Sequence, residues 1–399
     1  MTNQRNSDVD ALSSGRRTLS SLVLGTGFGL TGAGTVMLGV LLPTISQKWG
    51  LPDDSAGFLF FLQFLGSSLG ALLTGANRHR SLMRGYGLLV VSACALAFSE
   101  VHVLFAVFFF FGLGLGMAMT ATSLLFSDRY GDDRAAKLER LNFAWSAGAT
   151  AAPVLFLPFL HLASLRPLFF MFQGLFLSLF VWVTFKERQE TGSAESMLDE
   201  SLPPNAVPLA SLLPLVMLAM FAVGVEGTLS GWLTTYSHRA DLQNAGGAVL
   251  ATSLFWFGIM LSRLVFSTRL LAMMGRQRVL RLAIWCAAAS VALLIAAHNP
   301  TTIRVAAGLA GLGVGPLYPL FLSFLLERSA RGWIFSVAGM GSALFPWLTG
   351  LLSAHYGSLR YGLIVPCGAA LLMVVLLPAS LRAAGSPGLR RSSDLIDPA

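Results

Sequence analysis

Charge is scarce in this sequence. Only 12% of its 399 residues are charged, which is about half the share found in an average soluble domain. In their place, 55% of the residues are hydrophobic and the mean hydropathy is +0.69. The uncharged stretches are long, and apolar runs of eighteen or more residues are typical of membrane-spanning helices. The composition excludes an ordinary soluble domain and predicts an all-α membrane protein.

Other absences exclude further classes of protein. The alternating pattern of an outer-membrane barrel is missing. So are a His-Glu zinc motif, a phosphate-binding loop and a pair of membrane carboxylates suited to acid–base catalysis. The three cysteines, Cys94, Cys286 and Cys367, lie inside apolar runs without metal-ligand spacing, so we expect them to pack in the core. We therefore predict no enzymatic activity, no cofactor and no metal site.

The net charge of +8 does not indicate a nucleic-acid partner, because Lys and Arg lie mainly in short loops between apolar runs, where they set topology. Of the 27 basic residues, Arg263 lies within a span, and 21 (27 − 5 − 1) lie on the side of the N-terminus. The five on the other side are Lys48, Arg166, Arg239, Arg304 and Arg360. This asymmetry predicts cytoplasmic termini, and we expect a multi-pass protein of a bacterial inner membrane.

Twelve spans are predicted, at residues 18–46, 55–76, 82–99, 102–127, 138–162, 165–186, 209–237, 246–271, 277–297, 300–327, 331–355 and 358–381. One long polar interruption, 187–208, is rich in acids, Ser and Pro, as linkers are. It separates an N-terminal six-helix bundle (18–186) from a C-terminal one (209–381). Cytoplasmic tails are expected at 1–17 and 382–399.

The two halves resemble each other. The run GLGLG at 112–116 is followed by Asp128-Arg129, and GLGVG at 311–315 is followed by Glu327-Arg328. Both the glycines and the acids are 199 residues apart (311 − 112 and 327 − 128). Small-residue runs are common in membrane helices, but an acid–Arg pair at one fixed offset predicts internal duplication. Two six-span halves joined by a linker are the layout of transporters that rock about a central site.

With these features the chain resembles the major facilitator superfamily over nearly its whole length. Arg263 is followed by Gly275-Arg276-Gln277-Arg278, a run similar to the superfamily's loop between spans eight and nine. The equivalent first-half loop, GANRHRSLMR at 75–84, keeps the glycine and the basic residues but lacks the usual acid. The resemblance implies twelve helices in two pseudo-symmetric six-helix bundles.

Within the superfamily, Gly224-Val225-Glu226 followed by Gly231-Trp232 is similar to the fucose–proton symporter-like sugar porters, as is the span-eleven run 339–350. Bacterial symporters of that group carry an acid in span four, where Met119 stands here. They carry another in span one, and residues 18–47 contain no acid. The resemblance implies sugar transport, and it leaves open whether transport is coupled to protons.

Glu226 is the one acid placed well inside a predicted span. It lies seventeen residues after Leu209, about 25 Å along the helix and past the midplane. A charge at the bilayer centre costs about 2.5–3.5 kcal/mol on insertion scales, so it usually faces a hydrated cavity or a partner. Glu226 either binds substrate hydroxyls or protons, or pairs with a buried Arg and fixes its helix. Gly227 and Gly231 favour a locally opened helix beside it.

Five further side chains are candidates for substrate binding: Gln63, Asn142, Trp145, Trp256 and Tyr318. Gln63 lies on a polar face of span two, which either lines a cavity or packs against another helix. Asn142 and Trp145 lie one helical turn apart. Sugars are often bound by such a pair, with the hydroxyl groups on the amide and the apolar face of the pyranose on the aromatic ring. The alternative for these residues is packing, and Trp232 is expected to pack.

Arg263 belongs, by the resemblance, to a cytoplasmic gate. Its expected partners are Asp128-Arg129 and Glu327-Arg328, at the equivalent ends of spans four and ten. Opposite charges at these ends would hold the two halves together and part on opening. The alternative is that these residues only set topology.

The sequence thus predicts an alternating-access secondary transporter of a small polar solute, foremost a sugar. It would work as a monomer in the lipid bilayer, by proton symport through Glu226 or by uniport. An exporter of amphiphilic drugs or lipids is the alternative, which the 29 Phe residues allow.

Overall fold

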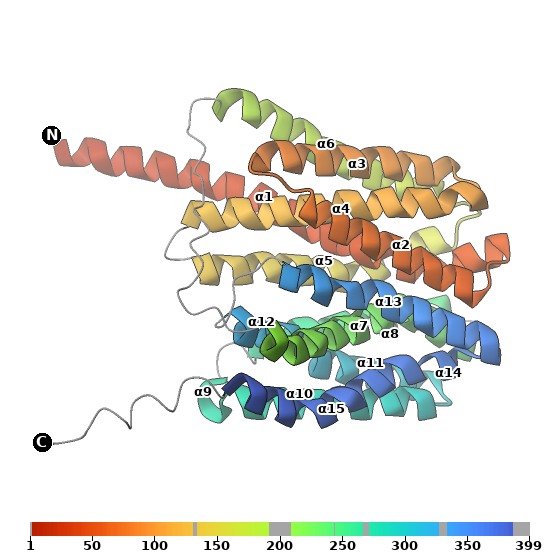
Figure 1. Ribbon diagram of the computed structural model, residues 1–399. Coiled ribbons are helices and arrows are strands. Elements are labelled where there is room, and N and C mark those ends of the chain that lie inside the picture. The colour runs from red at the N-terminus through yellow and green to blue at the C-terminus, as the bar shows by residue number, and fades with distance from the viewer. Residues whose placement is uncertain are drawn as a thin grey trace, which may run out of the picture. The chain divides into compact units, whose positions relative to one another are not determined.

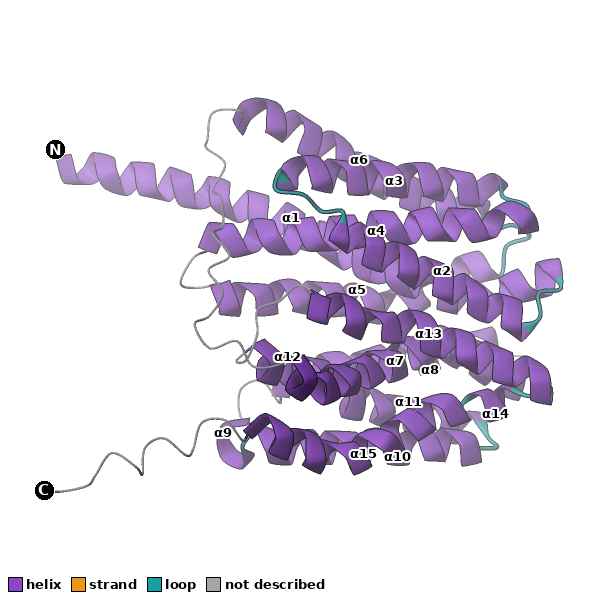
Figure 2. Cartoon of the chain, viewed as in Figure 1, coloured by secondary structure: helices purple, strands orange, loops and turns teal. Residues whose placement is uncertain are grey.

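The computed structural model describes residues 2–130, 134–190, 209–242, 244–265, 271–326 and 333–385. Every regular element in these ranges is a helix, as Figure 2 shows. Twelve helical segments in them are long and apolar enough to cross a membrane. The predicted all-α membrane fold with twelve spans is therefore confirmed.

The first six spans lie in helices that follow the predicted order (Figure 1). These are α1 (Thr2–Trp49), α2 (Asp53–Leu72), α3 (Arg78–Phe98), α4 (Val101–Tyr130), α5 (Arg134–Leu160) and α6 (Arg166–Glu190). Helix α1 includes the predicted N-terminal tail. Helix α2 begins at Asp53 and ends at Leu72, whereas the sequence predicted a span at residues 55–76.

The last six spans contain nine helices in the described ranges. These are α7 (Leu209–Ala240), α8 (Ala245–Val265), α9 (Leu271–Met274), α10 (Arg276–Ala296), α11 (Pro300–Val314), α12 (Leu317–Leu326), α13 (Trp333–Tyr356), α14 (Leu359–Gly362) and α15 (Ile364–Gly385). Span ten is divided into α11 and α12 at Gly315-Pro316. Proline has no N–H for the helical ladder and its ring obstructs the preceding turn, which explains the break.

The chain forms two compact units. Unit 1 contains residues 1–50 and 62–197, and unit 2 contains residues 51–61 and 198–399. The division at 197/198 falls inside the predicted linker, most of which lies outside the described residues. Residues 51–61, which we predicted to belong to the N-terminal bundle, cluster with unit 2, so helix α2 is divided between the units.

The glycine runs show the same packing in both units. In unit 1, α1 packs against α5, and α3 packs against α4 and α6. A Cβ at Gly112 would overlap the backbone of α2, and a Cβ at Gly114 would lie 3.0 Å from the Gly85 carbonyl oxygen of α3. In unit 2, a Cβ at Gly311 would overlap the backbone of α8, and one at Gly313 would lie 2.5 Å from the Ala287 nitrogen of α10. Spans four and ten thus use equivalent glycines against equivalent neighbours, which supports the duplication.

Unit 2 is built around α7. Helices α8, α12, α13 and α15 pack against it, and its residues 227–237 are buried without exception. Further toward its N-terminal end, Met217, Met220 and Phe221 are partly accessible. One part of α7 is therefore fully buried and another is partly exposed, with Glu226 at the transition.

Candidate functional site

Helix α7 is continuous past Glu226. The expectation that Gly227 and Gly231 open the helix was wrong, because α7 runs unbroken from Leu209 to Ala240. The glycines serve close packing instead: a Cβ at Gly227 would lie 3.0 Å from Cα of Ser342, and one at Gly231 would lie 2.9 Å from the Phe60 ring. Ser342 also donates to the Val223 carbonyl at 3.3 Å. Glu226 therefore projects from a continuous, closely packed helix.

The Glu226 carboxylate faces Arg263 of the next helix. The Arg263 Nη2 atom lies 3.5 Å from Oε2 of Glu226. Glu226 lies 14 residues before the end of α7 (240 − 226), and Arg263 lies 18 residues after the start of α8 (263 − 245). In an antiparallel pair this offset of four residues is about 6 Å along the helices, which an extended arginine covers. Sequence reasoning had raised a buried Arg as one possible partner, without identifying it.

The broken span supplies a third group to this site. The carbonyl of Gly315 would normally accept a hydrogen bond from the backbone nitrogen four residues later, but that residue is Pro319, which has no N–H. Nε of Arg263 donates to this carbonyl at 3.3 Å. A buried backbone carbonyl must find a donor, so the proline directs the guanidinium of Arg263 toward α12.

Tyr318 completes the group. It lies between the two prolines, three residues after Gly315, and is partly buried. We call Glu226, Arg263, Tyr318 and the Gly315 carbonyl the charge cluster. The side chains of Glu226 and Arg263 are 17% and 25% exposed, so they are accessible from within the span. The cluster offers a carboxylate acceptor, a guanidinium with five N–H donors and a phenol, and its two charges compensate each other.

The remaining predicted binding residue of unit 2, Trp256, lies in its core. Trp256 is buried and packs edge-on against Phe255, with ring centroids 5.6 Å apart. Trp232 is also fully buried, and its indole N–H donates to the Pro346 carbonyl at 2.9 Å, so it packs as expected. Trp256 therefore lies within the protein core in this conformation.

The candidates of unit 1 are dispersed. Gln63 is buried, with Nε2 donating to the Thr35 carbonyl at 3.1 Å. Asn142 is exposed, whereas Trp145 on the same helix is partly buried. A Cβ at Gly32 would overlap the backbone carbonyl of Trp145, so α1 approaches α5 closely there. Gln63 connects α2 to α1, which is a packing role in the described conformation.

Most of the predicted gate lies outside the residues that the structure describes. The side chains of Asp128 and Arg129, and residues Glu327 and Arg328 altogether, lie outside the described residues. Arg263 is described, and its observed acidic partner is Glu226. The assignment of Arg263 to a gate with those residues followed its position in a loop motif, which gave no information on the direction of its side chain.

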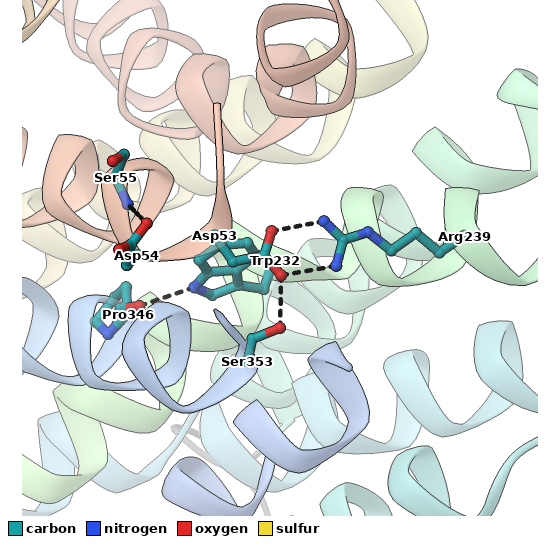
Figure 3. A network of polar contacts seen from close by, with 7 residues as sticks. All are labelled: Asp53, Asp54, Ser55, Trp232, Arg239, Pro346 and Ser353. Carbon is teal, nitrogen blue, oxygen red and sulfur yellow. Dashed lines mark hydrogen bonds and ion pairs between the residues drawn. The ribbon is translucent and has the colours of Figure 1, made fainter. Parts of the chain in front are cut away.

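Sequence reasoning missed a second polar network of unit 2, drawn in Figure 3. It joins Asp53 at the start of α2, Arg239 near the end of α7 and Ser353 in α13. Asp53 received no role in the prediction, and Arg239 was counted only as a topology charge. The available signal was an acid next to the expected start of span two.

The fold of these units is also found in known proteins. The family model of the Major Facilitator Superfamily matches residues 24–332. Among solved structures, a mutant of the peptide transporter POT in complex with sulfate has a TM-score of 0.73 and 14% identity, with coverage of 92% of this chain and 95% of that one. At this identity the similarity concerns the fold alone. No curated protein sequence matches the chain.

The family match spans more than half of the chain. Together with twelve apolar helices and the broken span beside the charge cluster, it identifies a secondary transporter and not an enzyme. The chain belongs to the Major Facilitator Superfamily.

Proposed function

We propose that this transporter moves a small polar solute by alternating access, with the charge cluster as the solute site and Glu226 as the proton-binding group. The observation that carries the proposal is the accessible Glu226–Arg263 pair in the middle of a span, beside a helix break. Ionised groups inside a span usually mark a substrate or proton path, and broken helices in transporters supply free backbone groups to such sites.

Proton binding and solute binding are coupled through Arg263. When Glu226 is ionised, the guanidinium divides its donors between that carboxylate and the Gly315 carbonyl. Protonation of Glu226 removes its negative charge, so Arg263 can turn its donors to the solute. The freed N–H groups of Arg263 need acceptors, so the protonated cluster favours a state in which oxygen atoms of the solute accept hydrogen bonds from Arg263.

A sugar is the solute class that we place first. The cluster presents donors and acceptors for hydroxyl groups and a tyrosine ring for the apolar face of a pyranose. Its charges compensate, so a neutral solute adds no uncompensated charge. The span-seven and span-eleven resemblance to sugar porters favours the same class, as do the glycines at 224 and 231.

A peptide-like zwitterion is the second candidate. The opposite charges of Glu226 and Arg263 can bind an ammonium and a carboxylate of one solute, and a solved structure of similar fold is named as a peptide transporter. The third candidate, an amphiphilic drug or lipid, would require a large apolar site instead of a charge pair.

The proposal is tested by uptake into proteoliposomes with a pH dye inside. We expect one of the solute classes, supplied as sugars, dipeptides or lipophilic cations, to be taken up with protons by the wild type. The Glu226→Gln variant keeps solute binding and loses proton-driven accumulation at least tenfold, because an amide cannot release a proton. The matched control, Asp241→Asn, removes an acid just beyond α7 and should transport normally.

Solute flux without proton movement in the wild type would contradict coupling through Glu226 and leave a uniporter. Unchanged accumulation by Glu226→Gln would contradict its role as the proton site. From the distribution of Lys and Arg we also propose that both termini are cytoplasmic. We further propose that the protein works as a monomer in a bacterial inner membrane.

A further inference from the structure

Both halves of the chain carry the motif His-x-x-Ser-Leu-Arg at the start of their last span. It stands at 161–166 and at 355–360, an offset of 194 (360 − 166). At the end of the third span stands Ala97-Phe98, and at the end of the ninth stands Ala297-His298, an offset of 200 (298 − 98). The duplication therefore extends to these two places, with one difference: the second half has a histidine where the first has a phenylalanine.

The two arginines of the motif cap equivalent helix ends. In unit 1, Nε of Arg166 donates to the Ala97 carbonyl at 3.1 Å. In unit 2, Nη2 of Arg360 donates to the Ala297 carbonyl at 2.8 Å. The last carbonyls of a helix have no partner within the helix, and the helix dipole favours a cation there. Each arginine thus ties the start of its unit's sixth span to the end of the third.

The second contact of each arginine involves the residue that differs. The Arg166 guanidinium lies over the Phe98 ring, 5.5 Å from its centroid. Nη1 of Arg360 lies 3.3 Å from Nδ1 of His298. Arginine has no acceptor atom, so Arg360 must be the donor and Nδ1 of His298 must carry no proton. The contact in unit 2 therefore requires neutral His298, whereas the face of a phenylalanine ring attracts a cation and does not titrate.

Protonation of His298 weakens its contact with Arg360. Histidine ordinarily changes its charge between about pH 5 and 8, and His298 is exposed. A proton on Nδ1 removes the acceptor and places two cations side by side. Exposed charges act on each other weakly, and the Ala297 carbonyl still accepts from Arg360, so this junction loosens without coming apart.

Arg360 is the charged group that contacts His298 among the described residues. Other titratable or charged side chains on the nearby turns of the surrounding helices are Tyr236, His238 and Arg239 of α7, Arg304 of α11, His355 and Tyr356 of α13, Tyr361 of α14 and Cys367 of α15. Arg304 donates to the Gly247 carbonyl at 3.3 Å, and His355 lies edge-on against the Tyr356 ring. In the part of the chain that the structure describes, no acid forms an ion pair with His298 that would stabilise its protonated form.

The same end of α10 is also joined to α7. The hydroxyl of Tyr236 donates at 2.6 Å to the carbonyl of Leu294, one turn before Ala297. Helix α7 and the start of span twelve therefore hold one helix end together. A change in the contact of Arg360 reaches, through this end, the helix that carries Glu226.

We propose that His298 makes this end of unit 2 sensitive to acid. Neutral His298 and the Ala297 carbonyl together hold Arg360, and we call these three groups the Arg360 clamp. Protonated His298 loosens the clamp and with it the junction of α7, α10 and α14, while the equivalent end of unit 1 is unaffected. The clamp acts inside one unit and needs neither a solute nor Glu226, so the inference goes beyond the proposed function.

The test measures chain motion beside the clamp. A nitroxide spin label is attached through Thr301→Cys, at an exposed position in the first turn of α11, in a chain whose Cys94, Cys286 and Cys367 are replaced by Ala. Electron paramagnetic resonance spectra are recorded in low-salt detergent buffer at about pH 8 and about pH 5. We expect the mobile fraction of the label to rise about twofold in acid, and to stay constant in His298→Phe, which has the residue of unit 1.

His355→Gln is the matched control, because this histidine contacts Tyr356 and lies outside the clamp; it should respond to acid like the parent chain. The reverse exchange is made in unit 1, with the label at His102→Cys in the first turn of α4, an exposed position. There we expect Phe98→His to create a response to acid that the parent chain lacks.

A label that is equally mobile at both pH values in the parent chain would overturn the proposal. So would an equal response to acid in the parent chain and in His298→Phe. If His298→Phe does not fold, His298→Gln decides in its place, since its amide oxygen accepts from Arg360 without titrating, and a response like that of the parent chain would again overturn the clamp. The readout needs no solute, so its failure is distinguishable from failure of the proposed transport.

Discussion

Two of the carboxylate–arginine pairs of unit 2 lie on the same helix, one in the middle of α7 and one at its end. In the middle, Arg263 approaches Glu226 through one contact of 3.5 Å and divides its donors with the Gly315 carbonyl. At the end, Arg239 binds Asp53 through two contacts of 2.8 and 2.6 Å, and Ser353 adds a third. The same chemical groups thus form a loose pair in one place and a closed network in the other.

The difference follows from what surrounds each pair. Glu226 and Arg263 project from two helices of unit 2 that are firmly packed side by side, and neither side chain is fully enclosed. Asp53 belongs to a segment that is attached by its side chains, and its carboxylate is only 11% exposed. A loose pair between fixed helices is suited to exchanging partners with a solute. A tight network on a divided helix is suited to holding two surfaces together.

Removal of Arg263 should have the largest effect on stability. Arg263→Gln leaves Glu226 without its compensating charge, and we expect a loss of about 2–3 kcal/mol, below the range for fully buried pairs because the site is partly accessible. Thermal unfolding in detergent measures it. The double variant Glu226→Gln/Arg263→Gln should recover most of the loss. Equal stability of single and double variants would show that the two side chains are not energetically coupled.

A substitution at Pro319 tests whether the Gly315 carbonyl keeps Arg263 from closing on Glu226. Pro319→Ala supplies an N–H for the Gly315 carbonyl, so Arg263 is free to close on Glu226. We expect solute affinity to fall several-fold, equivalent to about 1 kcal/mol, because Glu226 then competes better with the solute for the N–H groups of Arg263. Pro316→Ala is the control, since it restores an N–H toward the Leu312 carbonyl. Equal loss of affinity in both variants would contradict the role of the Gly315 carbonyl.

The smallest expected effect is a difference in salt sensitivity. Arg239 is 42% exposed, and the contribution of such an ion pair is screened at high ionic strength. The cost of Arg239→Gln should fall by about 0.5 kcal/mol between 0.05 and 1 M salt, whereas the cost of Arg263→Gln should hardly change. Unfolding curves at the two salt concentrations measure both values. If the stability cost of Arg263→Gln also fell at high salt, the charge cluster would be as solvated as the protein surface.

Span positions were predictable because each depends on a local run of apolar residues, and the lipid core requires about twenty of them. The broken tenth span also had a local cause, since Pro316 and Pro319 follow the glycine run. The effect of Gly227 and Gly231 was not local. Their neighbours Ser342 and Phe60 lie more than a hundred residues away in sequence, so the sequence could not distinguish close packing from an opened helix.

The twelve spans and the unusual position of Glu226 inside one of them were determined by the sequence alone. Each is a matter of composition along one stretch of chain, and hydrophobicity acts on such a stretch wherever it lies. The tertiary structure decided which charges meet. Arg263 contacts Glu226, and Asp53 is held by Arg239 and Ser353, because side chains find partners across helices whose rotation and depth only packing fixes.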